Sequence, residues 1–248
     1  MLKIIICGIN GKMGNFIYEN ALKRSHTVIC GIDKSTVGFT ECPVYADFEQ
    51  IKYLADVIID FSSPSALPYL LDYATANKLP LVIGTTGYTE EQEKLISDAS
   101  KLVPIFKSAN MSLGINLLIK LCKTANISLK GYDLEITEFH HKNKKDSPSG
   151  TANLIYQSLA PTFSSPKTLT YGRKGNSKRK DGEVGIHSIR GGSTVGKHTV
   201  YFFGENESIS ISHEAHSKEL FAEGAIKASE FIVTKNAGLY GMNDLIEI

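Results

Sequence analysis

The sequence of 248 residues has few cysteines, almost no net charge and no long apolar run, and each shortage excludes a class of protein. Lys+Arg is 27 and Asp+Glu is 26, so the net charge of +1 gives no general attraction to nucleic acid or anionic membranes. None of the four cysteines forms a Cys-x-x-Cys pair, so we expect reduced thiols, with neither a disulfide framework nor a bound metal. No apolar run reaches the roughly 18 residues of a membrane span.

The apolar run at the amino end, MLKIIIC, is also short. It breaks at Gly8, too early for a secretion signal, so we expect a soluble, cytoplasmic protein. A hydrophobic content of 42% is enough for one large core or two smaller ones.

The first third of the chain alternates strand and helix signals. Apolar runs indicate buried strands at 2–7, 26–32, 57–61, 81–83 and 103–106. Helical signals lie between them, at 13–23, at 64–77 and after a capping box formed by Thr89 and Gln92. Strands joined by helices imply right-handed parallel crossovers, so the pattern predicts an α/β, Rossmann-like, doubly wound parallel sheet over 1–110.

The pattern changes after residue 111. Strand signals appear at 132–139, 197–203 and 207–213, and the stretch 172–192 is rich in Gly, Lys and Arg without helical periodicity. We therefore expect a second, α+β domain over 111–218 with a mixed or antiparallel sheet. A helical tail from about 219 returns to complete the first domain, to residue 248.

The segment CGINGKMG contains Gly8, Gly11 and Gly14 between a buried strand and a helix. It approximates the dinucleotide fingerprint G-x-G-x-x-G, although Asn10 occupies the middle glycine position. Glycines let the backbone approach a pyrophosphate, and the helix N-terminus attracts its charge. The alternative is merely a tight strand-to-helix turn.

Asp33 and Lys34 end the second strand and give opposite indications about the cofactor. Asp33 would accept hydrogen bonds from a ribose, which favours NADH. Lys34 could pair with a 2′-phosphate, which favours NADPH, or be a solvated surface charge. We predict that both cofactors are used.

The segment EFHHKNKKDSPSGTA, residues 138–152, combines basic side chains with a helix start. His140 and His141 end a strand, and their side chains point to opposite faces. Lys144 follows on the loop, where an ammonium can act as a proton donor. This combination suits a small substrate that carries carboxylates and needs a proton; the alternative is a solvated basic loop.

The end of that segment resembles a helix N-terminus. Ser147 fits the N-cap position and Pro148 the first helical position. Gly150 and Thr151 then fall in the first turn, where free backbone N–H groups attract an anion.

Along nearly its whole length the chain resembles a known family, the dihydrodipicolinate reductases of lysine/diaminopimelate biosynthesis. The matching segments are GINGKMG, DFS, GTTG, SANMSLGIN, EFHHKNKKDSPSGTA, HSIRGG and GLYGMNDLI. The family signature E-x-H-H-x-x-K-x-D-x-P-S-G-T-A is met at every fixed position. This is far more specific than the glycine turn.

The resemblance implies an NAD(P)H-dependent reduction of 4-hydroxy-tetrahydrodipicolinate by a homotetramer built through the second domain's sheet. His140 and Lys144 would be the catalytic acid–base and proton-donor residues. The substrate carboxylates would contact His141, Ser149, Gly150 and Thr151. The cofactor, NADH and/or NADPH, would contact Gly8, Ile9, Asn10, Gly11, Lys12, Met13, Asp33, Lys34, Gly84, Thr85, Thr86, Ser108, Ala109, Asn110 and Met111.

Three positions depart from the commonest family pattern. Met111 replaces a frequent Phe beside the nicotinamide, and Lys34 and Lys218 replace frequent arginines, so cofactor preference stays open. Two other functions are possible alternatives. The first is another two-domain dehydrogenase, which need not carry the signature. The second is a redox sensor that binds NAD(H), which would need the glycine turn but not the ionisable groups of 138–152.

Overall fold

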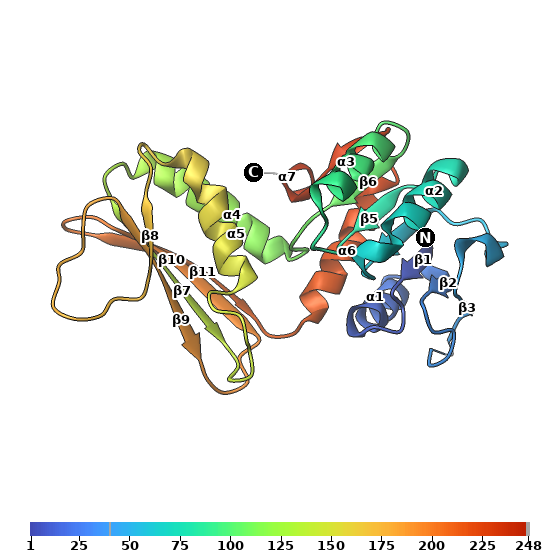
Figure 1. Ribbon diagram of the computed structural model, residues 1–248, viewed down its shortest axis with the longest axis horizontal. Coiled ribbons are helices and arrows are strands. Elements are labelled where there is room, and N and C mark those ends of the chain that lie inside the picture. The colour runs from blue at the N-terminus through green and yellow to red at the C-terminus, as the bar shows by residue number, and fades with distance from the viewer. Residues whose placement is uncertain (40, 247–248) are drawn as a thin grey trace. The chain divides into compact units, whose positions relative to one another are not determined.

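The computed structural model describes residues 1–39 and 41–246, which form two compact units (Figure 1). The first unit contains Met1–Leu113 and residues 219–246, and the second contains Gly114–Lys218. Residues 247 and 248, which the sequence also assigned to the first domain, lie outside the described residues. That the first unit binds the dinucleotide and the second the substrate remains a prediction.

Seven parallel strands form the sheet of the first unit, in the order β12-β6-β5-β4-β1-β2-β3. They are β1 (Lys3–Cys7), β2 (Thr27–Ile32), β3 (Val44–Tyr45), β4 (Val57–Asp60), β5 (Leu81–Ile83), β6 (Pro104–Lys107) and β12 (Gly238–Tyr240). The order reverses at β1, which pairs with β2 on one side and β4 on the other. Ligands bind at the carboxyl ends of strands beside such a switch point. The predicted doubly wound sheet is confirmed.

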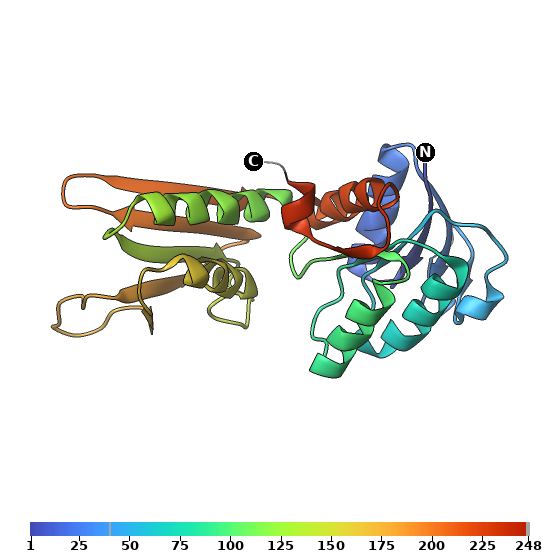
Figure 2. The same cartoon turned by 90° about the horizontal axis from the view of Figure 1, so that it is seen from above.

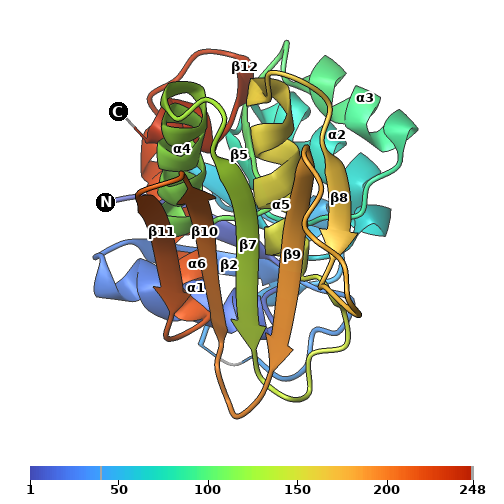
Figure 3. The same cartoon turned by 90° about the vertical axis from the view of Figure 1, so that its left-hand side faces the viewer.

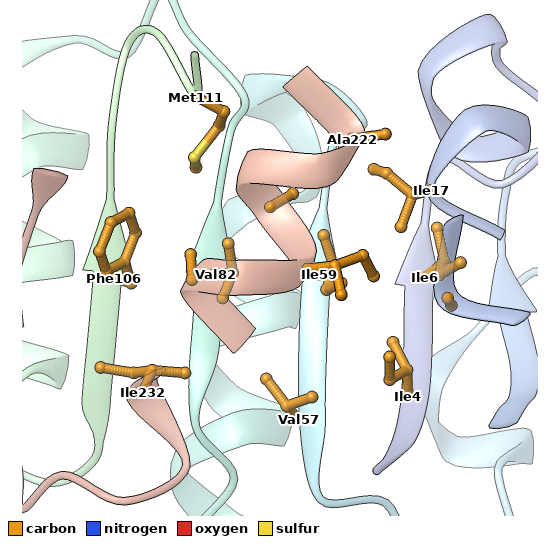
Figure 4. Close-up of a cluster of buried hydrophobic side chains, with 14 of the residues drawn as sticks. Ile4, Ile6, Ile17, Val57, Ile59, Val82, Phe106, Met111, Ala222 and Ile232 are labelled. Atoms are coloured by element: carbon orange, nitrogen blue, oxygen red, sulfur yellow. The ribbon is translucent and has the colours of Figure 1, made fainter. Parts of the chain in front are cut away.

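Helices cover both faces of this sheet (Figure 2). One face packs against α1 (Lys12–Lys23) and α6 (Glu219–Ile232), and the other against α2 (Leu67–Asn77) and α3 (Glu90–Ala99). The core on the α1 and α6 face brings together side chains from five neighbouring strands, among them Ile6, Val82 and Phe106 (Figure 4). Because side chains alternate along a strand, Ile4 and Ile6 of β1 lie in this core and Ile5 lies in the other.

Short elements complete the first unit: the 3₁₀ turns η1 (Phe48–Gln50) and η2 (Pro64–Ala66), and the helix α7 (Met242–Leu245). Thr89 caps α3 as predicted, since its side chain accepts from the Gln92 amide and the Gln92 side chain accepts from the Thr89 amide.

The second unit is a five-stranded mixed sheet in the order β11-β10-β7-β9-β8 (Figure 3). Its strands are β7 (Asp133–His140), β8 (Thr168–Tyr171), β9 (Glu183–Arg190), β10 (Gly196–Phe203) and β11 (Ser208–Ala215). β7 pairs parallel to β9 and antiparallel to β10, so the predicted mixed sheet is confirmed. The helices α4 (Leu113–Ser128) and α5 (Gly150–Leu159) pack on one face, and η3 (Ala160–Thr162) follows α5.

The sequence analysis predicted neither the helices α4 and α7, nor the strands β3, β8, β9 and β12, nor the 3₁₀ turns η1 and η3. The inward side chains of β9 change from Val184 and Ile186 to Ser188 and Arg190, so an apolar alternation stops halfway along the strand. β12 has only three residues, and it is a strand because it pairs with β6. Across residues 1–39 and 41–246, no helix is both long and apolar enough to cross a bilayer.

Candidate active site

The glycine turn between β1 and α1 is shaped by close backbone packing. Gly8 has φ +81°, and a Cβ on it would lie 2.4 Å from the carbonyl oxygen of Phe61. A Cβ on Gly14 would lie 2.3 Å from the carbonyl oxygen of Gly8, so this glycine lets α1 approach the turn. Both positions therefore require glycine, for conformation at the first and for space at both.

The N-terminus of α1 is open to an anion. Gly11 is the N-cap residue, it offers no side chain to the helix, and the first turn carries no acidic residue. The first N–H groups of an α-helix have no intrahelical partner, and the helix dipole adds positive potential there. The turn thus fits a pyrophosphate.

A pocket of about 1370 Å³ lies beside this turn. Five of the predicted cofactor residues line it: Gly8, Asn10, Gly11, Asp33 and Lys34. The Asn10 amide donates to Oδ2 of Asp33 over 3.0 Å, which fixes the carboxylate at the end of β2. The second carboxylate oxygen of Asp33 is left for a ribose hydroxyl. A dinucleotide half therefore fits the residues present.

The other predicted cofactor residues lie outside that pocket's lining. Lys12 and Met13 are in the first turn of α1, while Gly84, Thr85 and Thr86 follow β5, and Ser108, Ala109 and Asn110 follow β6. Ile9 and Met111 are 0% and 2% exposed and belong to the core, so only their backbone groups can meet a cofactor. The segments after β5 and β6 leave the same edge of the sheet as the glycine turn.

Asp60, at the end of β4, is a site residue to which the sequence analysis gave no role. It is 1% exposed, and its Oδ1 accepts from the Ser62 hydroxyl over 2.5 Å. Burial raises the pKa of Asp60, and this outweighs the hydrogen bonds from Ser62, Thr85 and Tyr88, which lower it. The Ser62 amide in turn donates to Oγ1 of Thr85, so Asp60 ties the loop after β4 to the loop after β5. The DFS segment contained this residue without indicating its burial.

In the second unit, β7 places Glu138 and His140 two residues apart on the face that α5 covers. They are 0% and 8% exposed. Nδ1 of His140 lies 2.6 Å from Oε2 of Glu138. The short distance and the burial make this a dedicated pair within the sheet.

Arg190 of β9 clamps Glu138 from the neighbouring strand. Its Nη1 and Nη2 donate to the two carboxylate oxygens, each over 2.7 Å, and the Ser149 amide donates to Oε1 over 3.1 Å. Burial alone would raise the pKa of Glu138, but hydrogen bonds from Arg190, Ser188, His140 and the Ser149 amide outweigh it and lower the pKa to about 2. Glu138 is therefore ionised at neutral pH.

The pKa of His140 is lowered as well, which for a base favours the neutral form. Burial lowers it, and the charges of Lys144 and Arg190 lower it further, while the hydrogen bond and charge of Glu138 oppose the shift. The net direction is downward, so the imidazole is neutral near pH 7.

The helix start predicted at Ser147 and Pro148 is wrong by two residues. Helix α5 begins at Gly150 with Ser149 as N-cap, because the Ser149 hydroxyl accepts from the Ala152 amide over 3.1 Å. Gly150 does lie in the first turn, as predicted, and so does Thr151.

Ser149 also contacts a buried histidine that the sequence analysis did not identify. Its hydroxyl lies 3.0 Å from Nε2 of His198, which is 3% exposed. Burial lowers the pKa of His198 to about 3, so this imidazole stays neutral. The rings of His140 and His198 meet edge to face with centroids 5.2 Å apart. The site is thus a neutral imidazole pair beside an ionised carboxylate.

Lys144 and His141 lie on the loop that joins β7 to α5. Nζ of Lys144 lies 2.8 Å from Oδ1 of Asp146, and its side chain is 22% exposed. The His141 amide donates to the carbonyl of Thr194, which holds the loop against the β9–β10 connection. Lys142 and Lys145 are exposed.

Glu138, Arg190 and His198 are the residues of this site that sequence reasoning missed. Glu138 was in the quoted segment, and its two-residue spacing from His140 on a predicted strand was a usable signal. Arg190 and His198 come from strands whose pairing with β7 no local pattern reveals. Within the described residues, no group of three His, Cys, Asp or Glu side chains is arranged to hold a metal ion.

A doubly wound unit with a dinucleotide pocket, followed by an α+β unit with buried ionisable groups, is the architecture of a two-domain, nicotinamide-dependent dehydrogenase. Two solved structures share this fold. A dihydrodipicolinate reductase from Paenisporosarcina sp. TG-14, bound to dipicolinate, has a TM-score of 0.85 at 24% identity, covering 99% of this chain and 100% of that one. A probable dehydrogenase from Thermotoga maritima has a TM-score of 0.63 at 13% identity, covering 98% and 92%.

The family follows from sequence matches. Models of the dihydrodipicolinate reductase N-terminus and C-terminus match residues 2–111 and 114–246. A 4-hydroxy-tetrahydrodipicolinate reductase of Caldanaerobacter subterraneus subsp. tengcongensis is 47% identical over 249 residues, covering 100% of this chain and 99% of the relative. One of Clostridium tetani is 45% identical over 248 residues, covering 99% and 97%. The chain belongs to the dihydrodipicolinate reductase family, and it is an oxidoreductase that uses NADH and/or NADPH.

Proposed function

We propose that this protein reduces 4-hydroxy-tetrahydrodipicolinate to tetrahydrodipicolinate with NADH or NADPH, in lysine/diaminopimelate biosynthesis. The observation that carries the proposal is the full-length identity of 47% to a reductase of that name. The buried cluster that the signature segment forms around Glu138 and His140 supports it.

Genetic complementation tests this proposal in a cell. A bacterium that lacks its own reductase and requires diaminopimelate should grow without it when this chain is expressed. The His140→Ala variant, expressed to the same level, should not restore growth. If neither strain grows without diaminopimelate, the proposed function is contradicted.

Residues of the second unit hold the substrate in the proposed mechanism. In this proposal one carboxylate lies at the N-terminus of α5, where the helix dipole favours an anion and Gly150 and Thr151 form the first turn. The Gly150 amide contacts the Asp146 carboxylate in the structure, so the substrate carboxylate would take the place of that side chain. His141 and Ser149 complete this grip. The second charge of the substrate is met by the Lys144 ammonium, whose charge also acts on His140.

The chemistry divides between the cofactor and the chain. When bound, the reduced nicotinamide supplies a hydride to the substrate ring after the substrate has lost water. Lys144 and His140 handle the proton that balances the negative charge then developing on the substrate. Positioned groups of this kind contribute about 10²–10⁴ in rate.

The first unit supports the use of both cofactors, with NADH preferred. Among the described residues that line the pocket Lys34 is the one base, while Asp33, Asp47 and Glu49 are acids that repel a 2′-phosphate. We expect kcat/KM for NADH to exceed that for NADPH by no more than about tenfold. Lys34→Ala should lower kcat/KM for NADPH and leave that for NADH unchanged. Steady-state kinetics with each cofactor check this, and a strong preference for NADPH would contradict it.

Thr151→Ala should mainly raise the KM for the substrate. Thr151 lies in the first turn of α5, where it binds the substrate in the ground state as well as the transition state. We expect an increase of about 10- to 150-fold, as the loss of one hydrogen bond to a charged group implies, with a smaller change in kcat. The control is Thr124→Ala on the exposed side of α4. A loss in kcat alone would show that Thr151 acts in the chemical step instead.

Two further expectations complete the proposal. We place the reaction in the cytoplasm, and we expect four chains to assemble through the sheet of the second unit. Ile189 and Phe203 support this assembly, because they lie on the sheet face opposite α4 and α5 with exposures of 46% and 43%. Sedimentation equilibrium should give four times the chain mass.

A further inference from the structure

Glu138 is a fully buried carboxylate that is held by donors from two neighbouring segments. It is 0% exposed, receives both donors of the Arg190 fork, and accepts from the Ser149 amide. Burying such a pair gains little stability over apolar side chains of the same volume. Ser188 of β9 also donates to Glu138, and the contact of Glu138 with Nδ1 of His140 is 2.6 Å long.

We propose that Glu138, clamped by Arg190, is a positioning residue that keeps the proton of His140 on Nδ1 and leaves Nε2 as a hydrogen-bond and proton acceptor. The inference rests on the proposed function for the role of His140 in turnover, but the tautomer itself is a property of the free protein. His140 would therefore enter each cycle as an acceptor at Nε2.

The tautomer follows from the donors available in the pair. An ionised carboxylate offers only acceptors, so a contact of 2.6 Å requires the hydrogen to come from Nδ1. With Nε2 protonated instead, a lone pair of Nδ1 would face the carboxylate. A neutral imidazole carries one N–H, so placing it on Nδ1 leaves Nε2 bare.

Gly196 leaves space at that bare nitrogen. A Cβ on Gly196 would lie 3.0 Å from Nε2 of His140, tighter than an ordinary contact. The first residue of β10 thus has no side chain where it passes the ring. Any other residue at position 196 would place its Cβ against Nε2.

Four charged or titratable groups face His140, and they decide how the pair responds to pH. Glu138 shares its strand, Arg190 comes from β9, His198 from β10, and Lys144 from the following loop. Glu138 alone favours the imidazolium. Removing its charge should lower the pKa of His140, so the pH at which the neutral imidazole is lost should fall.

The direct test is the tautomer of His140 in the unmodified protein. Nitrogen-15 NMR of histidine-labelled protein near neutral pH, assigned by comparison with His140→Asn, should show Nδ1 protonated and Nε2 unprotonated. A protonated Nε2 with a bare Nδ1 would overturn the proposal. This readout does not depend on turnover, so a protein without reductase activity would refute the proposed function and leave the tautomer test intact.

A substitution tests the consequence for activity. In Glu138→Gln an amide group can donate to Nδ1, which shifts the proton to Nε2. We expect kcat to fall by about 10- to 100-fold, within the range for a general acid or base, and the acid limb of kcat/KM to move to lower pH. Glu138→Asp, which keeps the charge, should retain the wild-type limb. Unchanged kcat and an unmoved limb in Glu138→Gln would overturn the proposal.

Glu230 supplies a matched control in the first unit. It accepts from Arg24 and lies 3.0 Å from Nε2 of His26, so it repeats the Glu–Arg–His chemistry outside the site. Glu230→Gln should lower the melting temperature and leave kcat and the pH profile unchanged. If Glu138→Gln does not fold, Arg190→Lys loosens the clamp while it keeps the cation, and the His140 tautomer population should become mixed. A single tautomer with Nδ1 protonated in that variant would show that Arg190 is not needed.

Discussion

Lys144→Ala is expected to lower kcat by about 10²–10⁴-fold while the affinity for NADH stays within about twofold of wild type. Lys144 lies in the loop after β7, with its ammonium 2.8 Å from Asp146 and its charge felt at His140. The variant removes the cation that opposes the developing negative charge, an interaction made mainly in the transition state. The cofactor pocket is built from other segments and is unaffected. His140→Ala should give a loss of the same order.

Lys142 and Lys145 provide matched controls for Lys144. Both are exposed lysines of the same loop, so replacing either by alanine removes an equal charge within three residues of the site. We expect their kcat to remain within about twofold of wild type, as for isolated surface charges. The measurement is steady-state kinetics with purified substrate, combined with NADH titration by fluorescence. A near-normal kcat in Lys144→Ala would remove the proposed role.

Gly8→Ala is expected to lower kcat/KM for NADH by about 100-fold or more. The added methyl group would lie 2.4 Å from the Phe61 carbonyl oxygen, and the φ of +81° is unfavourable for alanine. Relief requires the glycine turn to move away from the loop after β4, and that turn is the proposed binding site of the pyrophosphate. About 3 kcal/mol of lost binding corresponds to this factor.

Gly131→Ala separates the effect of the backbone strain from that of the steric clash. Gly131 has φ +88°, but no atom lies within 4 Å of its added Cβ, so the variant carries the conformational strain without the clash. We expect it to lower the melting temperature slightly and to leave NADH kinetics unchanged. An equal loss of NADH affinity in both variants would contradict the account of the turn.

The parts of the fold that the sequence predicted are those with a local signal. Ile4, Ile5 and Ile6 form one buried run because β1 is covered on both faces, and this continuous pattern marks a parallel sheet. β9 had no such mark, because its inward positions change from Val184 to Arg190 where the strand leaves the core and enters the site. A strand that serves both the core and the site lacks a simple alternation.

The residues of the candidate site likewise fall into those with a local sequence signal and those without one. His140 and Lys144 stand in one contiguous segment whose spacing and family signature are visible in the sequence. Arg190 and His198 reach His140 only through the pairing of β9 and β10 with β7, at sequence distances that no pattern spans. The low pKa values of this site also come from the fold, since hydrogen bonds led by those of Arg190 lower the pKa of Glu138 and burial lowers that of His198.

The most direct test of the account is NADH oxidation by the purified protein in the presence of the condensation product of pyruvate and aspartate semialdehyde. The account predicts a rapid loss of NADH absorbance that requires both the protein and the condensation product. Lys144→Ala and Gly8→Ala should each reduce it severely, and Lys145→Ala should not. An intact, correctly folded protein that binds NADH but consumes none of it with this substrate would contradict the account.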